Sequence, residues 1–181
     1  NRIPDSRIDG QCIPVLLWMV DWLGENLSEA FTVYLRSGEK VLLMQRADEV
    51  ADFPGAWDGI YGVGDHGDVD SIISRITECT GITAENLDIV RTGMARGLAY
   101  GNRLNDVTPI LFMTEEVDVS PGTLYKGYEW VDPGKIQEKE YATPQLKDMY
   151  GDVASYLYIL KTSIGQEQNV ATEIRARLSG T

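Results

Sequence analysis

The alternation of hydrophobic and polar residues predicts a series of short strands between residues 30 and 131. Residues 30–36 (AFTVYLR) and 40–46 (KVLLMQR) are rich in β-forming side chains, and Gly38 lies between them. Two such runs with a short glycine-containing connection are typical of a β-hairpin. The same pattern predicts further strands over residues 59–63, 87–95, 108–115 and 127–131. The apolar run 13–23 has about half the length of a membrane span and predicts another core strand.

The spacing of apolar residues also predicts helices. Residues 69–80 are expected to be helical, with Asp68 or Asp70 as the N-cap and Gly81 positioned to end the helix. From residue 144 onward, apolar side chains recur at spacings of three and four, which indicates one face of a long amphipathic helix. That face consists of Leu146, Met149, Val153, Leu157, Leu160 and Ile164. Residues 166–178 are expected to form a more polar helix that docks on the domain or contacts a partner.

These elements predict an α/β fold in which a mixed sheet is flanked by helices. With 181 residues, 43% of them hydrophobic, the chain is long enough to bury the core of one compact domain. We expect the domain to span residues 30–150. Residues 1–29 would form an N-terminal arm and strand, and residues 151–181 would form C-terminal helices packed on the domain or extending from it.

The charge balance bears on the class of partner. The chain has 16 basic and 28 acidic side chains, a formal net charge of −12. This charge repels nucleic acid and anionic membranes at long range, so general binding to either is not expected. A small phosphorylated ligand is still compatible, because a local group of arginines or a bound cation reverses the field within one cleft. The simpler interpretation of the excess acid is a well-solvated surface.

The cysteine content favours a reducing compartment. Cys12 and Cys79 match no metal-binding or redox spacing, and two cysteines cannot form a disulfide scaffold. No secretory leader is visible at the start of the sequence. We therefore expect a cytoplasmic protein without a membrane segment, although a single disulfide between the two cysteines stays open.

Residues 53–82 (FPGAWDGIYGVGDHGDVDSIISRITECTGI) contain an aromatic-rich turn, a glycine-rich loop and the first predicted helix. This segment resembles the Nudix box, a loop–helix–loop in which helix glutamates hold magnesium against a diphosphate. The similarity continues through YEWVDPGKI and ATPQL and covers residues 30–150. It is greatest to the Nudix subfamily with a WxGxSG loop.

The resemblance implies a fold and an activity. Nudix proteins have an α/β/α sandwich with a mixed sheet, here followed by the predicted C-terminal helical extension. They generally hydrolyse a nucleoside diphosphate linked to another group and use divalent cations, which implies Mg²⁺ or Mn²⁺ as the cofactor. Residues that occupy matching family positions are Gly59, Gly62, Asp65, Glu78, Gly81 and Ile82.

The metal-binding helix departs from the family pattern. In the family an arginine is followed by a glutamate, and two more glutamates come three and four residues later; here these positions are Ser74, Arg75, Glu78 and Cys79. Residues at i, i+3 and i+4 share one helix face, so this face offers a single carboxylate to a hard cation. Two like charges about 4 Å apart repel by roughly 4 kcal/mol at an effective dielectric constant of 20. Arg75 therefore disfavours magnesium, and we expect it to pair with Glu78 instead.

Other candidate ligands and catalytic groups lie in loops. If an ion does bind, Asp65, His66 and Glu78 are the expected ligands, although a solvated loop that caps the helix is the simpler interpretation of the first two. Glu140, in the late loop QEKEY, is a candidate general base beside Glu78, with plain surface charge as its alternative. Cys79 is expected to be a small buried side chain that extends the apolar stripe of Ile72 and Ile76.

Candidate substrate-binding residues are aromatic or cationic. Trp57 and Tyr61 could stack on a base, although large aromatic residues at strand ends usually pack in the core. Arg91, Arg96 and Arg103 could give an acidic protein a local cationic site for phosphate.

Two functional hypotheses follow. The first is a Nudix-fold protein with a degraded metal site that binds a nucleotide or a diphosphate-containing small molecule, with weak or no hydrolysis. The second is an active but atypical hydrolase that cleaves a nucleoside-diphosphate-linked compound with Mg²⁺ or Mn²⁺. A homo-oligomer or a protein partner bound through the C-terminal helices is compatible with both.

Overall fold

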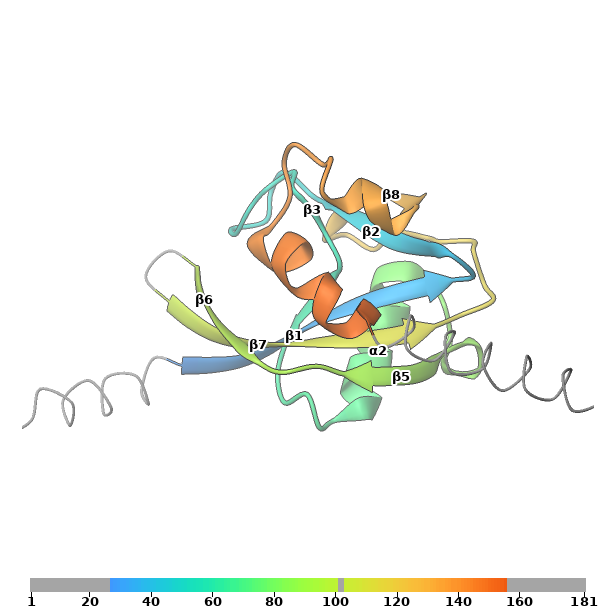
Figure 1. Cartoon of the computed structure of the whole chain (residues 1–181), viewed down its shortest axis with the longest axis horizontal. Coiled ribbons are helices and arrows are strands. Elements are labelled where there is room, and N and C mark those ends of the chain that lie inside the picture. Colours follow the sequence, from blue (N-terminus) through green and yellow to red (C-terminus); the bar gives the residue numbers. More distant parts are fainter. Residues whose placement is uncertain (1–26, 101–102, 156–181) are drawn as a thin grey trace, which may run out of the picture.

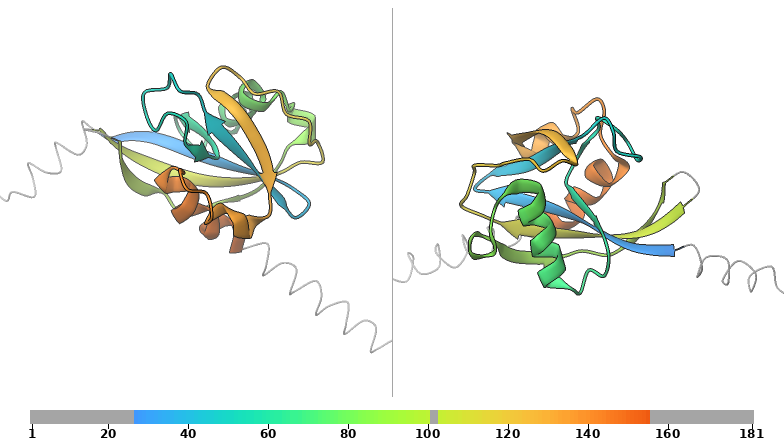
Figure 2. Two further views of the ribbon diagram at one scale, coloured as in Figure 1. Left: turned by 90° about the horizontal axis from the view of Figure 1, so that it is seen from above. Right: turned by 180° about the vertical axis from the view of Figure 1, so that it is seen from behind.

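The computed structural model describes residues 27–100 and 103–155, which form an eight-stranded mixed sheet with helices on both faces (Figure 1). The strands are β1 (Leu27–Ser37), β2 (Lys40–Arg46), β3 (Trp57–Asp58), β4 (Ile60–Val63), β5 (Asp88–Thr92), β6 (Arg96–Tyr100), β7 (Arg103–Met113) and β8 (Tyr125–Val131). Helix α2 (Val69–Thr80) covers one face, and a helix over residues 144–155 covers the other (Figure 2). Two short 3-10 helices, η1 (Ala84–Asn86) and η2 (Pro133–Ile136), lie in the connections. The predicted α/β/α sandwich is confirmed.

Strands β1 and β7 form the centre of the sheet. They pair in parallel from Leu27↔Leu104 to Arg36↔Met113, whereas the other strand pairs are antiparallel. The predicted hairpin between β1 and β2 is confirmed, and Gly38 in its turn has a φ of +56°. On the other side of β7, β6 pairs with the first half of that strand and β5 with the second half.

Alternate side chains of β1 enter two different cores, as the pleat of a strand requires. Phe31, Val33 and Leu35 belong to the core beneath α2, which we call the α2 core, together with Ile110 and Phe112 of β7. The side chains of the second core, beneath residues 144–155, are Ala30, Tyr34, Val41, Leu43, Val107, Leu111, Val131, Ile136, Leu146, Met149, Tyr150 and Val153. Because residues 30–35 of β1 (AFTVYL) are buried on both faces of the sheet, all of them except Thr32 are apolar.

Helix α2 has the predicted bounds, and its ends follow from its capping residues. Asp68 rather than Asp70 is the N-cap, since its carboxylate accepts a hydrogen bond from the backbone N–H of Ser71 at 3.1 Å. Gly81 ends the helix with a φ of +77°, a conformation that glycine adopts without the penalty of a side chain. Ile72, Ile76 and Cys79 are buried, so the prediction that the apolar stripe includes Cys79 is confirmed.

Two predictions about strands need correction. The predicted strand 87–95 is shorter, since β5 ends at Thr92, and a separate strand β6 follows that the hydrophobic pattern did not predict. Strand β7 begins at Arg103 rather than at residue 108. Strand β6 and the first residues of β7 pair with each other, and both contain polar as well as apolar side chains. Backbone pairing, rather than a run of apolar residues, therefore defines these segments.

Several predictions fall outside the described residues. These are the N-terminal arm, the strand over residues 13–23, the polar helix over residues 166–178, and Leu157, Leu160 and Ile164. The helix predicted from residue 144 is confirmed as far as residue 155. No helix in the described part of the chain combines the length and the apolar character that a membrane crossing requires.

Candidate functional site

A cleft of about 520 Å³ opens beside the loop that joins β4 to α2. One outer face of α2 forms a wall of this cleft, because residues 71, 74, 75 and 78 are spaced by three and four. The loop itself forms the other side. The lining residues are Phe31, Gly62, Val63, Gly64, Asp65, Asp68, Ser71, Ser74, Arg75 and Glu78.

Gly62 allows the loop to start close to the sheet. A Cβ atom at this position would lie 2.3 Å from Cζ of Phe31, a side chain of the α2 core. Only glycine therefore fits between β1 and the floor of the cleft. This match between Gly62 and the glycine expected from the family motif has a steric cause in the described structure.

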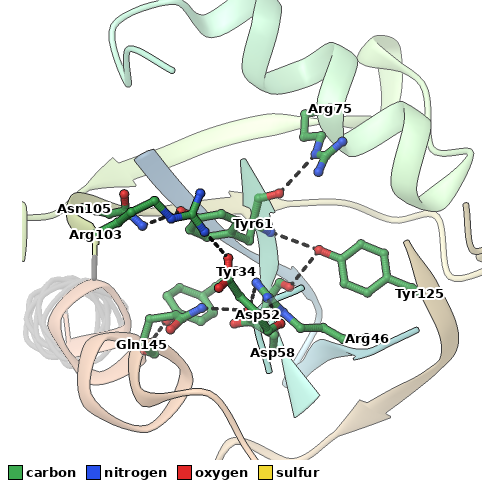
Figure 3. Close-up of polar contacts among 11 residues, drawn as sticks. Tyr34, Arg46, Asp52, Asp58, Tyr61, Arg75, Arg103, Asn105, Tyr125 and Gln145 are labelled. Carbon is green, nitrogen blue, oxygen red and sulfur yellow. Dashed lines mark hydrogen bonds and ion pairs between the residues drawn. The ribbon is translucent and has the colours of Figure 1, made fainter. Parts of the chain in front are cut away.

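Arg75 is the only arginine among residues 27–100 and 103–155 that lines this cleft. Its Nε donates a hydrogen bond to the backbone carbonyl of Tyr61 at 3.1 Å (Figure 3), and its Nη1 lies 2.9 Å from Oε2 of Glu78. The Arg75 side chain is 26% exposed, whereas the Glu78 side chain is 64% exposed. The predicted i,i+3 ion pair is therefore confirmed, and a positive charge occupies the face on which the family places metal ligands.

The other two carboxylates that line the cleft, those of Asp65 and Asp68, accept hydrogen bonds from nearby backbone N–H groups. The carboxylate of Asp65 accepts a hydrogen bond from the backbone N–H of Gly67 at 2.7 Å, and Asp68 caps α2. Asp68 precedes Glu78 by ten residues, which corresponds to about 15 Å along an α-helix. The hydrogen bonds from the Ser71 side chain and backbone lower the pKa of Asp68, so this cap is charged at neutral pH.

Few donors suited to a divalent cation lie on this part of α2. Burial raises the pKa of the Cys79 thiol to about 11, so this side chain is a neutral, soft group at the position of a family glutamate. Among residues 27–100 and 103–155, no three His, Cys, Asp or Glu side chains are grouped in a way that could hold a metal ion. Glu78 alone presents a carboxylate on this part of the helix face, and Arg75 engages it.

The remaining predicted metal ligand, His66, lies beside Asp65 in the loop. Its Nδ1 is 3.8 Å from Oδ1 of Asp65, and its side chain is exposed. His66 does not line the cleft, whereas Asp65 and Glu78 both do. The structure thus brings two of the three predicted ligands to one cleft.

A smaller cavity of about 140 Å³ adjoins the cleft at Arg75, which lines both spaces. The side chains of Arg46, Asp52, Tyr61 and Tyr125 contribute to its walls. The guanidinium carbon of Arg46 lies 5.3 Å from the centre of the Tyr61 ring, within the range of a cation–π contact. We call this space the Arg46 cavity.

A buried ion pair with Asp58 holds the Arg46 side chain in the wall of the Arg46 cavity. Nη2 of Arg46 lies 3.0 Å from Oδ2 of Asp58, and Nε2 of Gln145 donates a hydrogen bond to the same oxygen at 2.8 Å (Figure 3). Burial raises the pKa of the Asp58 carboxyl, and the Arg46 guanidinium and the backbone N–H of Gly59 oppose that rise. Sequence analysis did not identify this pair.

The predicted substrate-binding residues are distributed over the sheet. Tyr61 lines the Arg46 cavity, and its hydroxyl accepts a hydrogen bond from Nδ2 of Asn105 at 3.3 Å. Trp57 lies on β3 with the ammonium of Lys139 4.1 Å from its ring centre. Trp57 lines neither the α2 cleft nor the Arg46 cavity.

The three predicted phosphate-binding arginines do not line either cavity. Arg103 forms an ion pair with Asp52 at 2.7 Å, and Arg96 forms one with Asp152 at 2.5 Å. Arg91 lies on β5 opposite Leu111 of β7.

Glu140 is separated from Glu78. It lies in the exposed loop before residue 144, next to Tyr141, whose carbonyl accepts a hydrogen bond from the backbone N–H of Trp57 at 2.9 Å. The following helix covers the face of the sheet opposite α2 (Figure 2). The two predicted catalytic carboxylates therefore belong to segments that do not share a described cavity.

Comparison with known proteins identifies the fold. No protein-family model and no curated relative matches the sequence. Solved structures that match are a MutT protein from Methanosarcina mazei Go1 (18% identity, 72% of this chain and 94% of that chain, TM-score 0.59), a C. elegans Ap4A hydrolase in a binary complex (18%, 75% and 98%, 0.58), and the NUDIX domain of Shewanella oneidensis NrtR complexed with ADP ribose (13%, 72% and 88%, 0.58). At these identities the similarity establishes the fold, and the chain therefore has the Nudix fold.

Proposed function

We propose that this Nudix-fold protein binds a nucleotide or another diphosphate-containing small molecule in the α2 cleft, with weak or no hydrolysis. The observation that carries the proposal is the Arg75–Glu78 ion pair inside the cleft. The guanidinium supplies hydrogen-bond donors that match phosphate oxygens, and it repels a divalent cation from the same helix face. The cleft volume of about 520 Å³ lies within the usual range for a small-molecule site.

Two solved structures with this fold suggest the ligands to test first. One is named as an Ap4A hydrolase, and the other is a domain complexed with ADP ribose. Both compounds contain phosphoanhydride-linked phosphates, the group that the proposal requires. A reducing, cytoplasmic setting is part of the proposal, because Cys79 is buried as a free thiol. An oligomer or a protein partner bound through residues 151–181 stays a prediction.

The proposal is tested by measuring binding and turnover separately. Isothermal titration of ADP-ribose and Ap4A in the presence of EDTA should show saturable binding. A phosphate-release assay with a subsequent phosphatase step should show little or no cleavage of either compound in Mg²⁺ or Mn²⁺. Rapid metal-dependent cleavage that Glu78→Gln abolishes would instead establish the atypical hydrolase and overturn the proposal.

A further inference from the structure

Arg75 is held at the junction of two spaces. Its Nε is fixed by the carbonyl of Tyr61, and its side chain lines both the α2 cleft and the Arg46 cavity. Nη1 faces Glu78, and Nη2 makes no hydrogen bond with any residue in the described ranges. The guanidinium is thus positioned by the backbone of β4 while part of its donor set stays available to a ligand.

The carboxylates near Arg75 are distributed unevenly. Among the residues that the structure describes, Asp65, Asp68 and Glu78 line the α2 cleft, and Arg75 supplies the single positive charge there. In the Arg46 cavity, Arg46 is paired with Asp58 and Asp52 is paired with Arg103, so these charges compensate one another and leave no unpaired carboxylate facing Arg75 among the described residues that line it. A phosphate group is therefore repelled from the capped end of α2 and attracted to Arg75 on the side of the Arg46 cavity.

Glu78 forms an ion pair with Arg75, and a phosphate group can take the place of the Glu78 carboxylate in it. Its carboxylate is an anion at 2.9 Å from Nη1, and 64% of its side chain is exposed. Exposed ion pairs of this kind contribute little to stability, so moving Glu78 into solvent costs little. A diphosphate group carries at least two negative charges, whereas a carboxylate carries one, and it presents more oxygens to the planar guanidinium.

From these observations we infer that Arg75 is the phosphate-binding group of this protein, and that Glu78 is an internal competitor that the ligand must displace. The inference rests on the proposed function and extends it. It assigns to Glu78 the opposite effect from that of a metal ligand: loss of its charge strengthens phosphate binding instead of abolishing it. It also makes binding independent of divalent cations.

The test is a set of titrations with inorganic pyrophosphate and ADP-ribose in EDTA. Glu78→Gln should bind both probes about threefold more tightly than the native chain, because the competing charge is gone. Arg75→Gln should weaken binding at least about tenfold, and Arg75→Lys should recover part of the loss. The matched control is Glu115→Gln, which removes the same charge from an exposed position outside both cavities and should leave affinity unchanged.

A double variant separates competition from a general change in charge. In the Arg75→Gln background, Glu78→Gln should no longer improve binding, since without Arg75 there is no ion pair for the substitution to break. An equal improvement with and without Arg75 would contradict the inference. Thermal midpoints of all variants, measured in parallel, show whether each one folds.

The outcomes distinguish failure of the inference from failure of the proposed function. If the native chain binds ADP-ribose in EDTA but Glu78→Gln binds it equally or more weakly, the inference is wrong and the proposed function stands. If neither the native chain nor Glu78→Gln binds any probe without a divalent cation, both are wrong. Tightening in Glu78→Gln that depends on Arg75 supports both.

Discussion

Asp58 is a carboxylate with no exposed surface, and its position is explained by the donors around it. Nε of Arg46 lies 3.1 Å from Oδ2, and the backbone N–H of Gly59 lies 2.8 Å from Oδ1. Nε2 of Gln145, in the helix over residues 144–155, donates a third hydrogen bond, to Oδ2 at 2.8 Å. A buried carboxylate is tolerated only with such partners, because an isolated charge loses its hydration without compensation.

The first prediction concerns the removal of one partner. Arg46→Leu should lower the free energy of unfolding by about 3–5 kcal/mol, because it leaves the Asp58 charge buried and unpaired. Lys126→Leu is the matched control: its partner Asp48 is exposed, and loss of that pair should cost less than about 1 kcal/mol. Urea denaturation at neutral pH measures both. Equal losses in the two variants would contradict the role given to the buried pair.

The pH dependence of Arg46→Leu adds a second readout to this prediction. Burial already raises the pKa of Asp58, and removal of the guanidinium takes away the main opposing effect. A carboxyl whose pKa is higher in the folded state binds more protons there, so the variant loses stability as the pH rises through that raised pKa. The stability gap to the native chain should therefore narrow from neutral pH towards acid pH.

The two ion pairs show which contacts a sequence can predict. Arg75 and Glu78 are three residues apart on one helix, so helix periodicity alone brings them together. Arg46 and Asp58 lie on different strands, and their contact depends on the register of β2 against β3, where Met44 pairs with Asp58. Hydrophobic patterns do not specify that register. The face of α2 was predictable, and the Arg46 cavity was not.

At the scale of elements, helix ends were predictable and strand ends less so. Asp68 and Gly81 mark the ends of α2 because capping and the left-handed conformation each favour few residue types. Strand β6 contains an arginine and a glycine, and it exists through its pairing with the first half of β7. Strands defined by a partner carry a weak signal in their own sequence.

The second prediction compares two glycines in different elements. Gly151 lies within the helix over residues 144–155, is exposed, and has open space where a Cβ would be added. Gly151→Ala should therefore increase the free energy of unfolding by about 0.5–1 kcal/mol, since alanine loses less backbone entropy in a helix.

Gly62→Ala is the matched substitution with the opposite expected sign. Its Cβ would overlap the Phe31 ring, so we expect a loss of about 1–3 kcal/mol. Urea denaturation of the two variants checks both signs. Destabilisation by Gly151→Ala would contradict the helical environment assigned to that residue, and tolerance of Gly62→Ala would contradict the close contact beneath the cleft.

At the scale of the whole molecule, one sheet serves both cores and both cavities. Phe31 of the α2 core and Tyr34 of the second core are three residues apart on β1. The hydroxyl of Tyr34 donates a hydrogen bond to the carbonyl of Gln145, whose side chain reaches Asp58 behind the Arg46 cavity. A loss of structure in either layer therefore removes support from the other.

The third prediction is that the two layers unfold together. Trp57 packs against the second core and Trp130 against the α2 core, so each reports on one layer. Two single-tryptophan variants, with the other three tryptophans replaced by Phe, would isolate these signals. Within each variant, the urea midpoint from fluorescence should equal the midpoint from far-ultraviolet circular dichroism, because a shared sheet makes unfolding a single transition.

This comparison within one variant cancels any destabilisation by the replacements. A fluorescence midpoint that differs from the circular dichroism midpoint in either variant would show that its layer unfolds independently, and that ligand binding at Arg75 need not stabilise the helix over residues 144–155.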